Sequence, residues 1–278
     1  MIVEGYVTTK DGVRIFYRVH KKAGPWLVFL HGGGGSLSSW YQEEAFFSDK
    51  KYSLLFIDLR GHGYSDRGVT KEFFALRNFS RDLATLLRYF RIKKATIIGH
   101  CFGSIVVQQF CSEYPSMVDR VVLINSGNEP FRYRLWKAIT LAFSVFVYCL
   151  PFKGVKGHAD YSKFVGSYDI HVQRFFTDLY YAGRQTCSNT YRTTVNFKSP
   201  VKRFTKPVLL IHGRQDIIIP YEQSFELQKV FTNSTVKLLN TNHLAVYNDG
   251  PGVNQAIFEF LEKTKSYAAA LSDRTSAA

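Results

Sequence analysis

The stretch GHCFGS (99–104) follows the apolar run 95–98 and precedes a segment with helical periodicity. Its frame, Gly-x-nucleophile-x-Gly, is typical of a tight strand-to-helix turn that lifts the middle side chain above a sheet. Glycines on either side let such a turn close, because they bring no Cβ into it. Serine is usual at the middle position, and here it is Cys101. The stretch therefore predicts a nucleophile and leaves open whether the thiol is catalytic.

Apolar runs recur along the chain in a pattern that suits a buried parallel sheet. They predict strands at residues 26–30, 53–57, 95–98, 121–125, 208–211 and 235–239. Residues 3–9 and 13–20 alternate apolar and polar side chains around Asp11-Gly12, which predicts a β-hairpin. Helical periodicity lies between or after the strands, at residues 79–90, 103–114 and 253–263. The alternation predicts an α/β fold with a mostly parallel sheet flanked by helices.

The alternation breaks between residues 127 and 200, which are aromatic, basic and mostly helical in pattern. We expect them to form a helical cap inserted after the sixth strand, over a core formed by residues 1–126 and 201–266. Within the segment, residues 135–150 are apolar nearly all round. They predict a cap helix packed on the core, and the alternatives are a wall for an acyl chain or a surface that dips into a membrane. Residues 267–278 are rich in Ala and Ser, which predicts a flexible tail.

Composition and charge narrow the class of protein. The 278 residues are 46% hydrophobic and carry a net charge of +14, which indicates a globular, basic chain. Residues 129–206 hold 13 Lys and Arg against 4 Asp and Glu, a surplus of +9. No nucleic-acid recognition motif accompanies this charge, so an anionic substrate, peripheral membrane contact through the cap, or simple solubility explains it better.

Cysteine usage and hydropathy bear on the compartment. The four cysteines are widely spaced and form no C-x-x-C pair, which argues against a disulfide framework or a zinc ribbon. The first ten residues do not resemble a signal peptide, and no apolar run reaches about 18 residues. We therefore expect a cytoplasmic protein, and the sequence leaves its oligomeric state open.

A glycine-rich loop follows the strand at 26–30. Acyl transfer needs backbone N–H donors aimed at a developing oxyanion, and the loop HGGGG (31–35) allows such a close approach. Gly33 is the first choice of donor from this loop and Gly34 the alternative, while the N–H of Phe102 is the expected second donor. A phosphate-binding P-loop is disfavoured, because no Lys-Ser or Lys-Thr follows the glycines.

An acid and a histidine follow the last two strands. Asp216 ends HGRQD (212–216) after the strand at 208–211, and His243 follows the strand at 235–239. Glu129, placed after the preceding strand, is the runner-up acid. The order nucleophile, acid, histidine along the chain is the order of the α/β hydrolases.

Five stretches together resemble the capped esterase and epoxide-hydrolase-like group of α/β hydrolases, over residues 3–263. They are HGGGGS (31–36), DLRGHGYSD (58–66), GHCFGS (99–104), HGRQDIIIP (212–220) and TNH (241–243). The resemblance implies a nucleophile at Cys101, an orienting acid at Asp216 and a general base at His243. It also implies oxyanion donors at Gly33 and Phe102 and a structural loop at Asp58, Arg60, Gly61 and His62. Gly34, His100 and Leu244 are the expected substrate contacts.

The chain departs from this group at position 101, where serine is usual. Epoxide hydrolases and haloalkane dehalogenases of this fold carry an attacking aspartate there, so Cys101 argues against both chemistries. Cysteine occurs in a minority of the superfamily, such as dienelactone hydrolases and polyhydroxyalkanoate synthases. A merely buried Cys101, or a cysteine exchanged for serine, remains the alternative.

Structural roles, rather than catalytic ones, are expected for several other polar residues. Ser104 is expected to cap or pack within its helix, and His100 and His212 to be structural side chains beside strand ends. His62, His158 and His171 have no partner that the sequence identifies.

The expected function is hydrolysis of a carboxylic ester or thioester with a hydrophobic or lipid-like acyl group. It needs a small-molecule acyl substrate, no nucleic acid, no metal and no organic cofactor. An acyltransferase that uses a Cys101 acyl-thioester and a non-catalytic ligand-binding protein are the alternatives.

Overall fold

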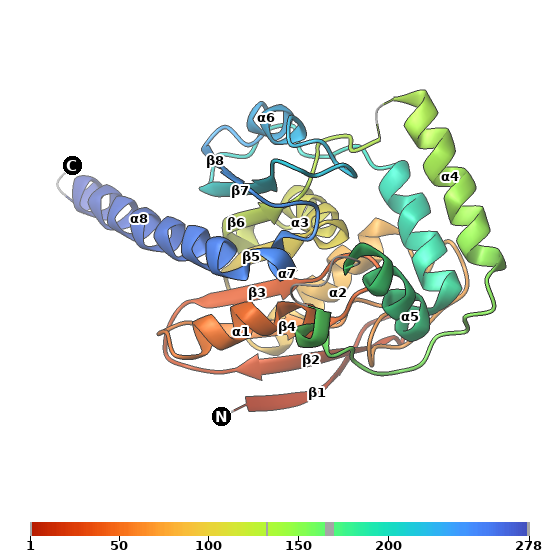
Figure 1. Ribbon diagram of the computed structural model, residues 1–278. Coiled ribbons are helices and arrows are strands. Elements are labelled where there is room, and N and C mark those ends of the chain that lie inside the picture. Colours follow the sequence, from red (N-terminus) through yellow and green to blue (C-terminus); the bar gives the residue numbers. More distant parts are fainter. Residues whose placement is uncertain (1, 132, 165–169, 277–278) are drawn as a thin grey trace.

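A computed structural model describes residues 2–131, 133–164 and 170–276, and it contains one eight-stranded sheet (Figure 1). The strand order is β1-β2-β4-β3-β5-β6-β7-β8. The pairs β1–β2 and β2–β4 are antiparallel, and every other pair is parallel. The strands are β1 (Ile2–Thr8), β2 (Arg14–His20), β3 (Trp26–Leu30), β4 (Ser53–Ile57), β5 (Ala95–His100), β6 (Val118–Ile124), β7 (Val208–Gly213) and β8 (Ser234–Leu239).

Helices cover both faces of this sheet, as the apolar runs predicted. Along β3, Leu27 and Phe29 enter one core cluster while Val28 and Leu30 enter the other, because side chains alternate along a strand. The first face packs against α1 (Tyr41–Ser48), α7 (Ala245–Asn248) and α8 (Gly250–Ser276). The second packs against α2 (Leu76–Tyr89), α3 (Phe102–Glu113) and α6 (Gln223–Gln228). The expectation of a mostly parallel sheet flanked by helices is confirmed.

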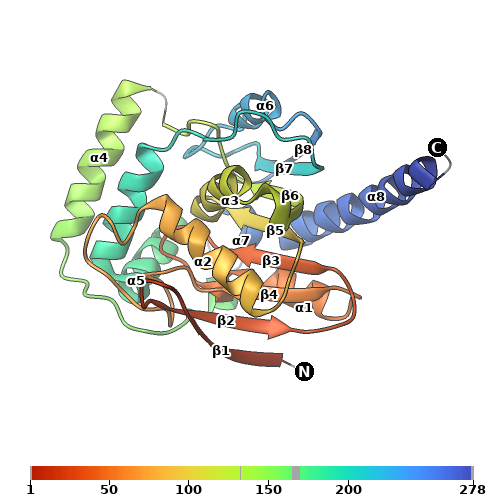
Figure 2. The ribbon, with the colours of Figure 1, turned by 180° about the vertical axis from the view of Figure 1, so that it is seen from behind.

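Two long helices occupy the stretch between β6 and β7, where the sequence predicts a cap. They are α4 (Arg134–Cys149) and α5 (Ile170–Val195), with a 3₁₀ turn at Tyr161–Phe164 between them. Helix α4 lies at the outer edge of the molecule beside α5 (Figures 1 and 2). Helix α5 is kinked at Gly183, whose φ of 82° is non-helical. The division into core and cap stays a prediction.

The C-terminal stretch is helical further along the chain than the sequence indicated. Helix α8 continues to Ser276, whereas residues 277–278 lie outside the described residues, and the flexibility expected for residues 267–278 stays a prediction. The alanines in this stretch have the highest helix propensity of all residues, so they extend the helix that precedes them. None of the helices in the described ranges is both long and apolar enough to cross a bilayer.

Candidate active site

Cys101 lies on a strained turn between β5 and α3. Its backbone has φ 49° and ψ −113°, in a region that residues with a Cβ rarely adopt. A Cβ on Gly99 would lie 2.6 Å from the backbone of Gly103, and a Cβ on Gly103 would lie 2.1 Å from the carbonyl oxygen of Leu30. Both glycines are therefore required for the close approach of α3 to the sheet, which holds Cys101 at the end of β5.

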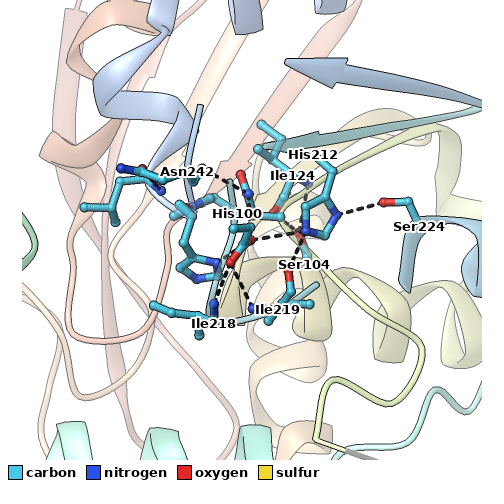
Figure 3. Close-up of polar contacts among 12 residues, drawn as sticks. His100, Ser104, Ile124, His212, Ile218, Ile219, Ser224 and Asn242 are labelled. Atoms are coloured by element: carbon cyan, nitrogen blue, oxygen red, sulfur yellow. Dashed lines mark hydrogen bonds and ion pairs between the residues drawn. The ribbon is translucent and has the colours of Figure 1, made fainter. Parts of the chain in front are cut away.

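Asp216 and His243 meet at the ends of the last two strands. The Nδ1 of His243 lies 2.8 Å from Oδ2 of Asp216. The backbone N–H groups of Ile218 and Ile219 each donate to Oδ1 of the same carboxylate at 2.9 Å (Figure 3). With Nδ1 engaged by Asp216, the Nε2 of His243 is left for the thiol of Cys101.

Sequence reasoning missed two further partners of Asp216. Asn125, which follows β6, donates from Nδ2 to Oδ2 at 2.8 Å. The Nε2 of His212 lies 3.1 Å from the same oxygen, and its Nδ1 lies 2.8 Å from Oγ of Ser224 (Figure 3). His212 is thus a structural side chain, as expected, and it holds the acid. No sequence motif predicts the contact of Asn125 with Asp216, because the two residues are 91 positions apart along the chain.

The electrostatics of the three groups favour charge separation. Burial opposes charge on all three, but the interactions among them outweigh it. The charge of His243 and its hydrogen bonding lower the pKa of the Cys101 thiol below its usual value. Cys101 and Asp216 in turn raise the pKa of His243, and the two histidines and the backbone of Ile219 lower the pKa of Asp216. The arrangement favours a thiolate beside an imidazolium.

The structure distinguishes Gly33 from Gly34 as the oxyanion donor of the glycine loop. Gly33 lines the cavity above Cys101, and a Cβ on it would lie 3.6 Å from Cβ of Phe102. Gly34 is not among the residues that line this cavity. Its N–H donates to Nε2 of His62 at 3.1 Å, and the side chain of Asp178 covers its Cα. The expectation that Gly34 contacts substrate, or replaces Gly33 as donor, is therefore corrected. Phe102 opens α3, where first-turn N–H groups have no intrahelical acceptor.

The 58–66 loop has the structural role that the resemblance implied. Asp58 accepts the N–H of Leu37 at 2.8 Å and lies 2.7 Å from Nε2 of His158. Arg60 is buried and bonds both oxygens of Asp82, at 2.7 and 2.6 Å. His62 and His158, for which no partner was predicted, thus brace the glycine loop and its neighbours.

A cavity of about 480 Å³ opens above Cys101. Its lining includes Cys101, His100, His243 and Leu244, together with aromatic side chains from the stretch between β6 and β7: Phe131, Trp136, Phe143, Phe175 and Tyr191. His100 is buried, and its Nε2 lies 2.9 Å from the carbonyl oxygen of His243. Burial lowers the pKa of His100 to about 3, so the ring is neutral and steadies the His243 loop. The walls are apolar enough to receive an acyl chain.

The structure also places His171, Glu129 and Ser104, which the sequence analysis considered. His171 lines it, whereas Glu129 has no contact with His243 among the described hydrogen bonds and ion pairs. Ser104 donates to the carbonyl oxygen of Gly99 and accepts the N–H of Ile124 at 3.2 Å, so it ties α3 to the sheet (Figure 3).

A buried ion pair in the cavity wall had no sequence signal. Arg174 and Asp178 lie one turn apart on α5, with Nε 3.2 Å from Oδ2. The guanidinium also lies over the ring of Tyr247 at 4.3 Å, a cation–π contact. The pair sits over the glycine loop and fixes α5 to it. No group of three or more His, Cys, Asp or Glu within the described ranges is arranged to hold a metal ion.

Comparisons with known proteins identify the fold. A family model described as "alpha/beta hydrolase fold" matches residues 25–144, and one described as "TAP-like protein" matches residues 173–271. A human relative, Protein ABHD8, is 25% identical over 240 residues, which are 84% of this chain and 54% of the relative. The chain thus spans about half the length of these curated relatives.

Solved structures share the fold. A hydrolase from Pseudomonas aeruginosa aligns with a TM-score of 0.79 at 20% identity, covering 93% of this chain and 98% of its own. An esterase from Thermogutta terrifontis aligns with a TM-score of 0.75 at 18% identity, covering 94% and 98%. The chain has the α/β-hydrolase fold.

Proposed function

We propose that this chain, which has the α/β-hydrolase fold and matches a family model of that fold over residues 25–144, hydrolyses carboxylic esters or thioesters through Cys101, His243 and Asp216. One observation carries the proposal. A thiol on a strained turn faces an imidazole whose other nitrogen lies 2.8 Å from a carboxylate, at the base of an apolar cavity. Nucleophile, base and orienting acid within reach of one another are the requirement for covalent acyl transfer.

The first half of the reaction acylates the thiol. Nε2 of His243 holds the proton of Cys101, and the thiolate sulfur attacks the carbonyl carbon of the substrate. The N–H groups of Gly33 and Phe102 stabilise the oxyanion. The tetrahedral intermediate then collapses, the bond to the alcohol or thiol breaks, and the leaving group takes the proton from His243. An acyl-thioester on Cys101 remains.

The second half releases the acid. Water attacks the acyl-thioester while His243 accepts one of its protons, and the oxyanion forms again in the same place. The C–S bond breaks, the carboxylic acid leaves, and the proton stays on His243 beside the released thiolate, which restores the starting ion pair. Asp216 keeps the imidazole in one orientation and stabilises its positive charge throughout.

The cavity supports a hydrophobic acyl substrate, since aromatic and aliphatic side chains make up about half of its lining residues. The nucleophile disfavours epoxide hydrolysis, which in this fold needs an attacking carboxylate at position 101. Cys101 also favours acyl transfer as a second candidate, because a thioester passes its acyl group readily to amines and thiols.

Nitrophenol release from p-nitrophenyl octanoate tests the proposal. We expect sustained release that Cys101→Ala abolishes, whereas Cys149→Ala, which changes an exposed cysteine, leaves it intact. A single stoichiometric burst would support acyl transfer to another acceptor. Release that Cys101→Ala leaves unchanged would exclude both.

A further inference from the structure

Helix α4 exposes an apolar surface that nothing in the described part of the chain covers. Of its 16 residues only Ser144 and Val147 are buried. Seven large apolar side chains of α4 are more than one third exposed, from Leu135 at 71% to Phe143 at 38%; the others are Trp136, Ile139, Val145, Phe146 and Tyr148. Exposed apolar residues gathered on one element mark an interaction surface rather than chance exposure.

This surface forms part of the rim of the proposed active-site cavity. Trp136 and Phe143 of α4 are exposed and also line the cavity. Ile217 and Ile218, which follow Asp216, are likewise exposed and line the cavity, and Ile217 is 83% exposed. The cavity mouth therefore carries exposed apolar side chains from two separate parts of the chain. An apolar rim suits a mouth that faces an apolar medium better than one that faces water.

A cationic groove of about 750 Å³ runs along the other flank of α4. Leu141 and Val145 of α4 form part of it, and Lys71, Arg192 and Lys198 contribute positive charge. None of its described lining residues carries a carboxylate. The groove therefore suits negatively charged groups that have apolar chains beside them.

We propose that α4 docks this protein on an anionic lipid bilayer, with its apolar side chains among the acyl chains and the cationic groove on the headgroups. A helix that lies in the interface combines an apolar face with basic flanks, which is the combination found here. The charge of the whole stretch agrees, since residues 129–206 carry a surplus of +9 and an anionic leaflet attracts such segments. Docked in this way, the cavity mouth faces the bilayer.

Lipid fits these observations better than a second copy of the chain. A second copy would bring the same +14 charge against this basic surface, and like charges oppose association. The inference goes beyond the proposed function, and its readout is binding, so a failure of catalysis leaves it untouched.

Co-sedimentation with vesicles of phosphatidylcholine, alone or mixed with phosphatidylserine, tests the proposal on the 278-residue chain. We expect binding to the mixed vesicles, weakened when salt shortens the Debye length from about 10 Å at 0.1 M to about 3 Å at 1 M. The variant Ile139→Glu/Phe146→Glu changes two exposed residues of α4 that do not line the cavity. It should weaken binding about tenfold or more, through lost apolar transfer.

A matched control separates the helix from the general effect of added charge. Ile2→Glu/Tyr89→Glu adds the same two charges at exposed apolar positions on β1 and α2. It should bind as the parent chain does. Circular dichroism of each variant verifies folding, and hydrolysis of a short soluble ester is expected to stay unchanged in both.

The groove is tested separately. Lys71→Gln/Lys198→Gln should weaken binding to the anionic vesicles at least about fivefold, because each lysine near a charged surface adds attraction. Lys10→Gln/Lys237→Gln, which removes two lysines outside the groove, should have a smaller effect. Three results would overturn the proposal: no sedimentation with either vesicle, equal binding by the α4 variant and its control, or a dimer that the α4 variant dissociates in the absence of lipid.

Discussion

Cys101 and His243 each shift the other toward its charged form. Burial alone would keep both groups neutral, but each is close enough to the other to reverse that effect. The remaining cysteines offer a comparison within one chain. Burial raises the pKa of Cys111 and Cys187, and Cys149 is exposed.

Alkylation by iodoacetamide measures this difference. The thiolate is the reactive form, and the pKa of Cys101 lies below its ordinary value. Cys101 should therefore stay reactive at a lower pH than an ordinary thiol does. We expect Cys101 to react faster than Cys149 at pH 7, with Cys111 and Cys187 nearly inert.

The variant His243→Gln removes the cause of the shift. The pH midpoint of Cys101 alkylation should then move upward, and the rate at pH 7 should fall about tenfold or more. Peptide mapping by mass spectrometry assigns the label. An unchanged pH midpoint in His243→Gln would contradict the charge-separated pair.

Asp216 orients His243, and its replacement tests that role. Asp216→Asn keeps the shape but can hold the imidazole in the wrong tautomer, so kcat on p-nitrophenyl octanoate should fall about 10³- to 10⁴-fold. Glu129→Gln is the matched control, because it changes the runner-up acid outside the described contacts of His243. Equal loss in the two variants would contradict the assignment.

The motif residues of the site could be predicted from the sequence, but their partners from distant parts of the same chain could not. Cys101, His243 and Asp216 could be named because glycine spacing and chain order constrain them. Gly34 was misplaced because a run of four glycines does not reveal which N–H another side chain already engages. Asn125 and the Arg174–Asp178 pair carry no local signal, since their importance comes from tertiary contacts.

At the scale of elements, burial decided which parts were predictable. The central strands were found because both faces are buried, which makes their sequence a continuous apolar run. The short helices α1, α6 and α7 were not predicted. Helix α1, for example, reads YQEEAFFS and lacks an apolar stripe.

The close approach of α3 to β3 gives an element-scale prediction. Gly103→Ala would place a Cβ 2.1 Å from the carbonyl oxygen of Leu30, so α3 would have to shift. We expect the free energy of unfolding in urea to fall by about 3 kcal/mol.

Gly12→Ala is the control for this substitution. Gly12 has φ +81°, but no atom lies within 4 Å of the place that an alanine Cβ would occupy. The variant should therefore lose only about 1 kcal/mol, from backbone strain without a clash. Equal losses at the two glycines would show that the contact with β3 does not matter.

At the scale of the whole molecule, a buried carboxyl makes stability depend on pH. Glu43 of α1 is fully buried, neither of its oxygens has a described hydrogen-bond partner, and burial raises its pKa to about 8. The folded state therefore binds the proton more tightly than the unfolded chain, where the pKa is about 4.3. The associated stability is complete below about pH 4 and is lost as pH rises through about 8.

Glu43→Gln should remove this dependence. Between pH 5 and pH 8 the parent chain should lose at most about 4 kcal/mol of unfolding free energy through this group. The glutamine variant should lose correspondingly less, and it should be more stable than the parent at pH 8. Glu113→Gln, an exposed glutamate on α3, should retain the parent's pH dependence in the same urea titrations. Parallel curves for the parent and Glu43→Gln would contradict a protonated Glu43.

The central claim is that the sulfur of Cys101 carries the acyl group during turnover. The most direct test is rapid mixing with p-nitrophenyl octanoate, acid quenching, and mass spectrometry of the digested protein. We predict one octanoyl group on the peptide that contains Cys101, formed within the first turnover and absent in Cys101→Ala. Turnover without acylation of this peptide, or acylation of Ser104 instead, would contradict the claim.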